Sequence, residues 1–194
     1  MEGLWQEDYF AISTWDAIPA GLRVISSRLV RRIKGMKRQS LHVLCHYAKG
    51  KPSPGGDLYA ATPSLVVWRL LMALTSWAMT MRPDILVLAC DVTKAFPPTD
   101  LDHPVVTTLP REAAGLVMHK GDQTAMLVGG EPVIVGKAQY GYRKSPRLFQ
   151  LWLANVLVEL TLSLSQVDST LFFSEDRQVQ VLFHVDDFRA QGSS

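Results

Sequence analysis

The 194-residue sequence has few cysteines and no hydrophobic run long enough to span a membrane. Its two cysteines, Cys45 and Cys90, show no pairing pattern, which predicts a reducing compartment and no disulfide scaffold. The best candidate for a membrane span, "LVVWRLLMAL", is shorter than the roughly 18 residues needed and is interrupted by Arg69. The N-terminal "MEGLWQEDYF" is acidic and aromatic, unlike a signal or transit peptide. What remains is a chain with 47% hydrophobic residues, enough for a globular core.

Acidic residues are missing altogether from residues 17–56. The same stretch contains nine basic residues: Arg23, Arg28, Arg31, Arg32, Lys34, Lys37, Arg38, Lys49 and Lys51. Because the formal charge of the whole chain is only +2, the rest of the chain is net acidic. A basic block of this kind suits a phosphate-bearing partner such as a nucleic acid. From charge alone, a solvated surface arm is an equally good interpretation.

The N-terminal half alternates strand and helix signals. Residues 22–33 predict a strand or a hairpin arm, and the Pro- and Gly-rich residues 50–57 predict a loop. A long, largely apolar helix is expected next, with Thr62 as N-cap and Pro63 at its first position, packed against a sheet. The continuous apolar run 85–91 predicts a central strand covered on both faces.

The C-terminal half predicts more strand than helix. Residues 105–137 contain short strand-like segments with glycine turns, and residues 145–165 indicate a second long helix. The stretches "STLFF" and "VQVLFHV" then predict a β-hairpin around a polar turn. This order of elements predicts one α+β domain over residues 1–194, an antiparallel sheet with helices packed on one face.

Three acidic side chains follow the predicted strands. Asp91 ends one apolar strand, and Asp186 and Asp187 end another. If the two strands are neighbours, the three carboxylates converge at one edge of the sheet. Oxygen ligands of this type suit Mg²⁺, and two such ions can stabilise an in-line phosphoryl transfer. From spacing alone, a turn cap and a polar hairpin end are the more common explanation.

Six segments, in order and in register, change this balance through a resemblance to a known family. They are "IPAGLRVISSRLVRRIKG", "DLYAATPSLVVWRLLMALTSWA", "CDVTKAFPPTDLDHPVVTTLP", "KAQYGYRKSPRLFQLWL", "VDSTLFF" and "VLFHVDDFRA". The fourth resembles "KALYGLKQAPRAWY" and the last resembles "LLLYVDDMLI", both typical of the reverse transcriptase of copia-type LTR retrotransposons. The resemblance covers nearly the whole chain and implies the fingers and palm of a right-hand polymerase.

The resemblance implies an RNA-directed DNA polymerase that adds deoxynucleotides to a primer 3′-hydroxyl by two-metal nucleotidyl transfer. It assigns Asp91, Asp186 and Asp187 as catalytic, metal-binding carboxylates, with Val92 as a further metal contact and Asp187 as the least certain of the acids. The ions are two Mg²⁺, with Mn²⁺ as a substitute. The implied partners are an RNA template, a DNA primer, deoxynucleoside triphosphates and other segments of the retrotransposon polyprotein, but no membrane.

The resemblance also supplies residues for the nucleotide and the nucleic acid. Phe96 would lie under the sugar and exclude a 2′-hydroxyl; without the family, a core phenylalanine is the alternative. The expected nucleotide-binding residues are Arg28, Thr93, Lys94, Ala95, Phe96, Tyr140 and Gly141. The expected nucleic-acid contacts are Arg31, Arg32, Lys34, Arg143, Lys144, Pro146 and His184. For any single arginine of the basic arm, an exposed strand face is the competing interpretation.

Three departures from the family pattern affect the expected activity. His184 stands where the family has tyrosine, and "AFPPTD" places two prolines after the first acid. The sequence stops seven residues after Asp187, so we expect a truncated second hairpin strand, poorly supported acids, and no thumb or RNase H domain. The isolated chain is therefore expected to be weakly active or inactive.

Two other interpretations stay open at this stage. The chain could be a decayed retroelement fragment that only binds nucleic acid or associates with the polyprotein. An unrelated metal-dependent phosphohydrolase could use the same acids, although the sequence contains no nucleophile motif for it. The expected location is a cytoplasmic virus-like particle or the nucleus, and not the secretory route.

Overall fold

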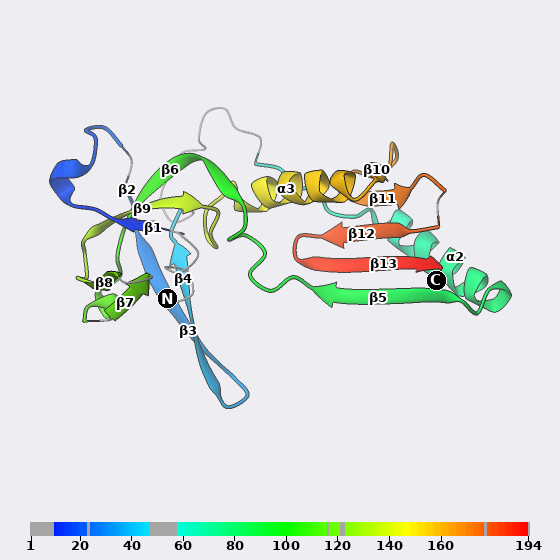
Figure 1. Cartoon of the computed structure of the whole chain (residues 1–194), viewed down its shortest axis with the longest axis horizontal. Helices are drawn as coiled ribbons and strands as arrows, with labels where there is room; N and C mark the ends of the chain where they lie inside the picture. Colours follow the sequence, from blue (N-terminus) through cyan, green and yellow to red (C-terminus); the bar gives the residue numbers. More distant parts are fainter. Residues whose placement is uncertain are drawn as a thin grey trace. The chain divides into compact units, whose positions relative to one another are not determined.

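The computed structural model describes residues 10–22, 24–46, 58–115, 117–120, 123–176 and 178–193 (Figure 1). The predicted loop at 50–57 lies outside these residues. The chain forms two compact units. Unit 1 comprises Met1–Leu58 and Phe96–Leu148, and unit 2 comprises Tyr59–Ala95 and Phe149–Ser194. The expectation of one domain over the whole chain stays a prediction, and each unit is described by itself.

Unit 1 is built from short strands. In chain order these are β1 (Phe10–Ile12), β2 (Val24–Ile25), β3 (Ser27–Lys34), β4 (Lys37–Leu44), β6 (Asp100–Thr108), β7 (Val117–Lys120), β8 (Gln123–Met126) and β9 (Pro132–Lys137), with 3-10 turns η1 (Trp15–Ala17) and η2 (Arg111–Ala113). Four of them form a sheet in the order β1-β9-β6-β2. The alternation in β9 explains its place, because Val133 and Val135 are fully buried beside Leu109 and Leu127.

The basic stretch folds into a hairpin. Strands β3 and β4 pair antiparallel along their whole length, from Ser27 opposite Leu44 to Lys34 opposite Lys37. Gly35, in the turn, adopts a φ of 61° that glycine accepts readily. The prediction of a strand or hairpin arm at 22–33 is therefore confirmed. The side chains of Arg32 and Lys34 lie outside the described part of the structure.

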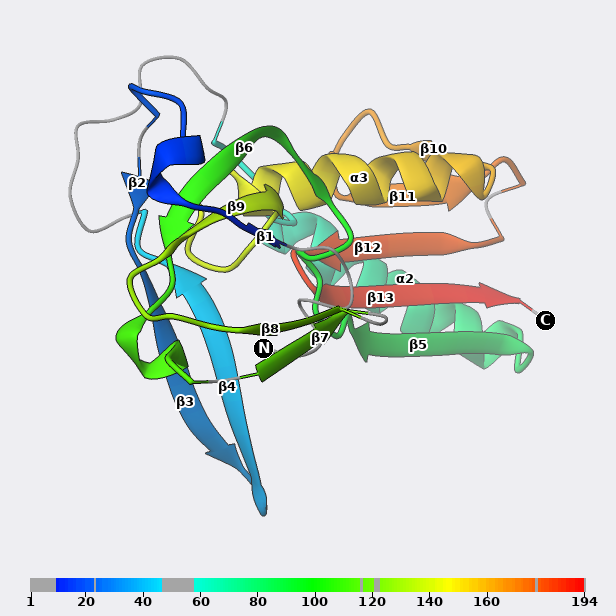
Figure 2. The same ribbon diagram turned by 60° about the vertical axis from the view of Figure 1, so that its left-hand side comes forward.

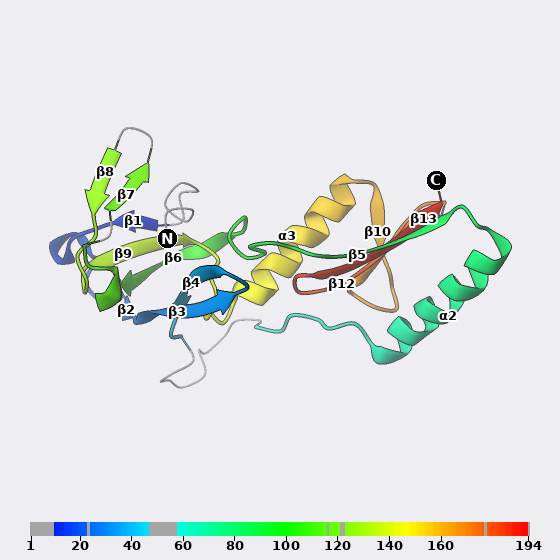
Figure 3. The same ribbon diagram turned by 90° about the horizontal axis from the view of Figure 1, so that it is seen from below.

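Unit 2 contains a five-stranded antiparallel sheet and helix α2 (Leu65–Met81). Its strands are β5 (Ile85–Asp91), β10 (Leu162–Leu164), β11 (Leu171–Ser174), β12 (Gln180–His184) and β13 (Asp187–Ser193), in the order β10-β11-β12-β13-β5. Figures 2 and 3 show β12, β13 and β5 side by side, and α2 alongside the sheet. The second helix, α3 (Ser145–Glu159), begins in unit 1 and continues into unit 2.

Aromatic side chains form the centre of this sheet. Phe172, Phe183 and Phe188, on three successive strands, have ring centroids 6.0 Å apart from one ring to the next. In α3, Phe149, Leu153 and Leu157 repeat every four residues, and all three are buried, as expected for one face of an amphipathic helix. The mixed helix and sheet content fits the predicted α+β class.

Two helix boundaries differ from the predictions. The N-cap of α2 is Ser64 instead of Thr62, so the helix begins after Pro63 and not with it. Helix α3 ends at Glu159 instead of 165, because Thr161 adopts a left-handed φ of 65° and the chain then enters β10. No helix in the described residues is long and apolar enough to cross a membrane.

Two strands also differ from the predictions. β13 has seven residues and pairs with both β12 and β5, so the second hairpin strand is longer and better paired than expected. β5 is the edge strand of the sheet, and not a covered central one, because β13 takes the position beside it. Its apolar side chains Leu86 and Leu88 are 66% and 59% exposed.

Candidate active site

The β-ladder of unit 2 places two of the predicted carboxylates opposite each other. Asp91, the last residue of β5, pairs with Asp187, the first residue of β13. Directly opposite residues of an antiparallel pair point to the same face, with Cβ atoms about 5 Å apart. The N–H group of Val92 donates to the carbonyl oxygen of Asp186 at 2.7 Å. Strands β5 and β13, which carry these two acids, are therefore neighbours, whereas β12, the strand before the acidic pair, is separated from β5 by β13.

The turn that carries the acidic pair is strained. Strands β12 and β13 are joined by Val185 and Asp186, with His184 opposite Asp187 as the closing pair. Val185 has a φ of 54°, which a β-branched side chain rarely adopts. Such strain persists only where surrounding structure enforces it. Here the enforcement comes from β13, which is paired along both edges.

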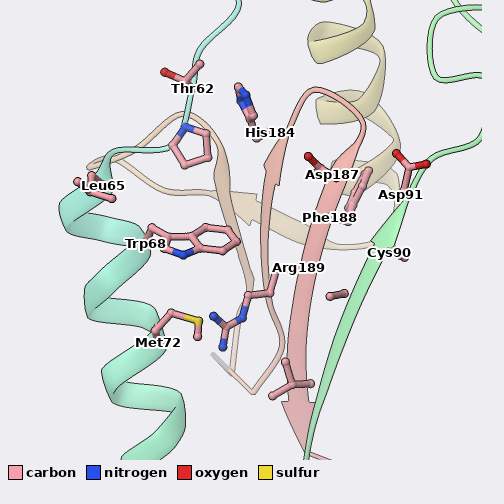
Figure 4. Close-up of a pocket in the computed structure, with 13 residues that line it drawn as sticks. Thr62, Leu65, Trp68, Met72, Cys90, Asp91, His184, Asp187, Phe188 and Arg189 are labelled. Atoms are coloured by element: carbon pink, nitrogen blue, oxygen red, sulfur yellow. The ribbon is translucent and has the colours of Figure 1, made fainter.

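Two carboxylates on one face of a sheet edge repel each other, and a bound cation would relieve this repulsion. Both side chains, of Asp91 and Asp187, are exposed, and Figure 4 shows them at the same end of the strand pair. Like charges directly opposite each other destabilise a ladder, and a shared cation removes the repulsion. Mg²⁺ commonly uses one or two carboxylates and completes its shell with water and phosphate oxygens. The donor set of the pair therefore fits Mg²⁺ or Mn²⁺.

The third predicted carboxylate is placed differently. Asp186 lies in the turn, half-buried, outside the ladder that pairs Asp91 with Asp187. Among the described residues, no three His, Cys, Asp or Glu side chains gather closely enough to hold a metal ion. Val92, predicted as a further metal contact, donates its N–H group to the carbonyl oxygen of Asp186. The pair Asp91 and Asp187 is thus what the structure brings together, and Asp187 had been the least certain of the three.

The segment after Asp91 combines exposed and buried residues. Thr93 and Lys94 are exposed, and Lys94 has a φ of 57°, whereas Ala95 is fully buried. Phe96 is only 7% exposed and packs edge-on against Tyr140, with ring centroids 4.7 Å apart. The structure therefore presents Phe96 as a packed core ring in unit 1, which was the alternative to its role under a nucleotide sugar.

The loop at 139–146, which contains the expected nucleotide-binding residues Tyr140 and Gly141, is closed by its own hydrogen bonds. Ser145 Oγ accepts from the N–H group of Gln139 at 3.0 Å and donates to the carbonyl oxygen of Gln139 at 2.7 Å. The Gln139 side chain bonds His42 at 3.0 Å, and burial lowers the pKa of His42, which favours the neutral ring. Pro146 follows in the first turn of α3, where its missing N–H group costs nothing.

Gly141 in this loop approaches the protein itself and not open space. Its φ is +82°, and a Cβ atom added there would lie 1.9 Å from the carbonyl oxygen of Leu44. The N–H group of Leu44 also donates to the carbonyl oxygen of Tyr140 at 2.9 Å. The glycine that was predicted to allow a nucleotide close to the backbone thus allows β4 close to the loop.

Two basic residues of the loop form hydrogen bonds within unit 1, Lys144 through its side chain and Arg143 through its backbone. Lys144 Nζ lies 2.6 Å from Asp102 Oδ2. The hydrogen bond between them raises the pKa of Lys144 and lowers that of Asp102. The backbone N–H group of Arg143 donates to His46 Nδ1 at 3.4 Å. Lys144 therefore has an internal partner where the sequence predicted a phosphate contact.

The predicted basic arm presents arginines on both faces. Arg28 and Arg31 are exposed on β3, opposite Val43 and Ser40 of β4. Because side chains alternate along a strand, residues three apart point to opposite faces. Arg28 and Arg31 therefore cannot contact one phosphate group from the same face of the hairpin.

Sequence reasoning missed two buried charged residues of unit 2. Asp168 accepts hydrogen bonds from the Ser64 N–H group and from the N–H and Oγ1 groups of Thr170, at 2.6–2.9 Å. Burial raises the pKa of Asp168, but these hydrogen bonds outweigh burial and leave it below its ordinary value. Arg189 is 9% exposed and lies under α2. The available signal was the spacing of Arg189 from Asp187 in β13. Residues two apart on a strand point to the same face, so Arg189 lies on the face that carries this acid.

A comparison of the chain with known protein families and with curated proteins found no match to either.

Proposed function

We propose that this chain is the fingers and palm region of a copia-type reverse transcriptase, with unit 2 as the palm and unit 1 as the fingers. The proposal rests on the family resemblance of the sequence. One observation carries it further: Asp91 lies directly opposite Asp187, although 95 residues lie between them in the sequence. A turn cap and an unrelated hairpin end would have no reason to be ladder partners.

The chemistry of the proposed site follows from its two carboxylates. Asp91 and Asp187 would hold Mg²⁺, which supplies the positive charge that stabilises the entering and leaving oxygens of a phosphoryl transfer. The protein's own contribution is to fix the carboxylates on adjacent strands, so that no reorganisation is needed when charge develops. The strained turn at Val185 holds Asp186 beside them, within reach of Val92.

The basic hairpin supplies the proposed contact with the nucleic acid. Exposed arginines such as Arg28 and Arg31 on β3 can bind phosphates without reading sequence. His184 is exposed at the end of β12, next to the acids, where a primer end would lie in this proposal. Affinity that depends on these charges falls steeply as salt is raised.

The alternative proposal is a module that binds nucleic acid without catalysis. The internal pairing of Lys144 with Asp102 and the burial of Phe96 favour it, since both residues were expected to face the substrate. The two proposals agree on the basic hairpin and differ only at the carboxylates.

Primer extension separates them. The purified chain is incubated with a primed RNA template, deoxynucleotides and Mg²⁺, and Asp91→Asn and Asp187→Asn are compared with Glu175→Gln, a change at an exposed acid in a turn of the same unit. The polymerase proposal expects incorporation that falls roughly 100-fold or more in the first two variants and stays unchanged in the third. RNA binding without incorporation by the unaltered chain would support the alternative. Equal incorporation by all variants would overturn the assignment of the carboxylates.

A further inference from the structure

Unit 2 contains a cavity between α2 and the sheet (Figure 4). Its volume is about 920 Å³, within the 300–1,000 Å³ typical of small-molecule sites. One wall is α2 with the residues before it, and the other is formed by β5 and β13. The cavity is an open cleft between helix and sheet and not an enclosed void, so a molecule from solution can enter it.

A largely buried arginine side chain lies along this cavity. Arg189 is 9% exposed, and its Nε atom has no hydrogen-bond partner. Among the described residues it forms no ion pair, and its guanidinium carbon lies 5.8 Å from the centroid of the Trp68 ring. Burying an arginine without an anion is unfavourable in general, and native proteins nearly always pair such a charge. Arg189 therefore lacks the partner that its burial calls for.

The sequence around Arg189 makes this charge unexpected. In the segment resembling "LLLYVDDMLI", the position of Arg189 is occupied by an apolar residue. An apolar side chain would fill part of the space between β13 and α2 without needing a partner. The chain instead places a cation there, so the resemblance does not account for it.

The remaining walls are mostly apolar. Leu65, Trp68 and Met72 line the cavity from α2, and Val87 and Ala89 line it from β5. Asp91 and Asp187 line it at one end, and with no cation bound their charges repel an anionic group from that end, which leaves Arg189 as its place. A molecule that matches these walls has an apolar body and a single negative charge, which it can place on Arg189.

We propose that this cavity binds an apolar carboxylate of small-molecule size. Its carboxylate pairs with the guanidinium of Arg189, including the unpartnered Nε–H, in the two-pronged geometry that arginine favours. Its apolar body lies against Trp68 and Met72. The ligand supplies the anion that Arg189 lacks, and its apolar body fills the space between helix and sheet. This inference concerns unit 2 alone and does not depend on polymerase activity.

Calorimetric titration of the purified chain tests the proposal with a matched pair of probes, naphthalene-1-acetate and its neutral amide. Neither metal nor nucleic acid is needed, so the result is independent of primer extension. We expect the acid to bind about 10- to 100-fold more tightly than the amide, because a hydrogen-bonded charge pair contributes roughly 1.5–3 kcal/mol. Arg189→Leu should abolish this preference and keep binding of the amide. Trp68→Ala should weaken both probes.

A matched control comes from the same helix. Arg69 is exposed on α2 and does not line the cavity, so Arg69→Leu should leave the preference for the acid intact. If circular dichroism shows that Arg189→Leu fails to fold, Arg189→Lys replaces it, with a preference for the acid reduced but present. The proposal is overturned if the folded, unaltered chain binds acid and amide equally or binds neither at millimolar concentration. It is also overturned if Arg189→Leu retains the preference, or if Arg69→Leu removes it.

Discussion

Two tight backbone segments of this protein each contain a residue with a positive φ, but they use different residue types for it. They are the loop at 139–145 in unit 1 and the turn at 184–187 in unit 2. The loop uses a glycine, Gly141, at a positive φ where no Cβ atom fits. The turn uses a valine, Val185, at a positive φ that valine disfavours. The first segment has the residue that its conformation requires, and the second does not. Strain kept without a steric need is typical of functional sites, and it is the turn that carries the acids.

The largest effect is expected at Gly141. Gly141→Ala would place a Cβ atom 1.9 Å from the Leu44 carbonyl oxygen, on rigid backbone, and would also carry the cost of a positive φ. We expect a loss of about 3–5 kcal/mol in the free energy of unfolding. Gly130→Ala is the control, because its φ is +90° but nothing lies within 4 Å, and it should cost only about 1–2 kcal/mol. Urea denaturation measures both, and equal losses would show that the contact with β4 is unimportant.

The hydrogen bonds that close the loop come next. Ser145 is fully buried, and Ser145→Ala leaves the N–H group of Gln139 without its partner, while the C=O group keeps only the N–H group of Tyr142, at 3.2 Å. We expect a loss of roughly 1–3 kcal/mol in the free energy of unfolding. The exposed Ser163, on β10, should tolerate alanine within about 0.5 kcal/mol. A similar small effect at both serines would mean that water replaces the bonds within the loop.

The turn should respond in the opposite direction. Val185→Gly removes the steric cost of the positive φ and is expected to stabilise unit 2 by about 1 kcal/mol, after the entropy cost of glycine is subtracted. Val167 is an exposed valine whose φ is not positive. Val167→Gly should therefore lower the free energy of unfolding by up to about 1 kcal/mol. Thermal unfolding compares the signs. If both changes destabilise, Val185 is not strained, and the contrast between loop and turn fails.

Sequence patterns predicted much of this contrast. The apolar run of β5 and the hairpin signal at β12 located the strand that ends at Asp91 and the strand before the acidic pair, because both patterns are local. The strand that brings Asp187 opposite Asp91 is β13, which was expected to be cut short. The resemblance identified Gly141 as a site of close approach, but the approaching backbone, that of Leu44, comes from about 100 residues earlier in the chain. No local pattern reveals such a partner.

Other features could not be predicted, for identifiable reasons. Helix α3 stops where Thr161 adopts a left-handed conformation, a position at which glycine is the usual signal. The apolar composition of β5 indicated a covered strand, yet sheet order depends on which strand pairs beside it, and β13 takes one edge only. The burial of Arg189 depends on α2 lying over the sheet, which is a tertiary contact.

The smallest effect is expected at the ion pair beside the loop. The hydrogen bond from Lys144 keeps the pKa of Asp102 below its unfolded value, so this stabilisation exists above pH ~4 and is lost as pH falls through the folded pKa. The same bond raises the pKa of Lys144, so its contribution exists below pH ~10 and is lost as pH rises through the folded pKa.

Between these limits the pair should contribute at most about 0.5–1 kcal/mol, because both side chains are partly exposed to water. Asp168 also has a lowered pKa and would mask the acid limb in a single measurement. A double-mutant cycle with Asp102→Asn and Lys144→Gln removes that background, because Asp168 is present in all four proteins. We expect a coupling energy that is present at pH 7, smaller at pH 3 and reduced by salt. A coupling of the same size at pH 7, at pH 3 and in added salt would show that the interaction is not electrostatic. Lys144 would then again be a candidate for contact with phosphate.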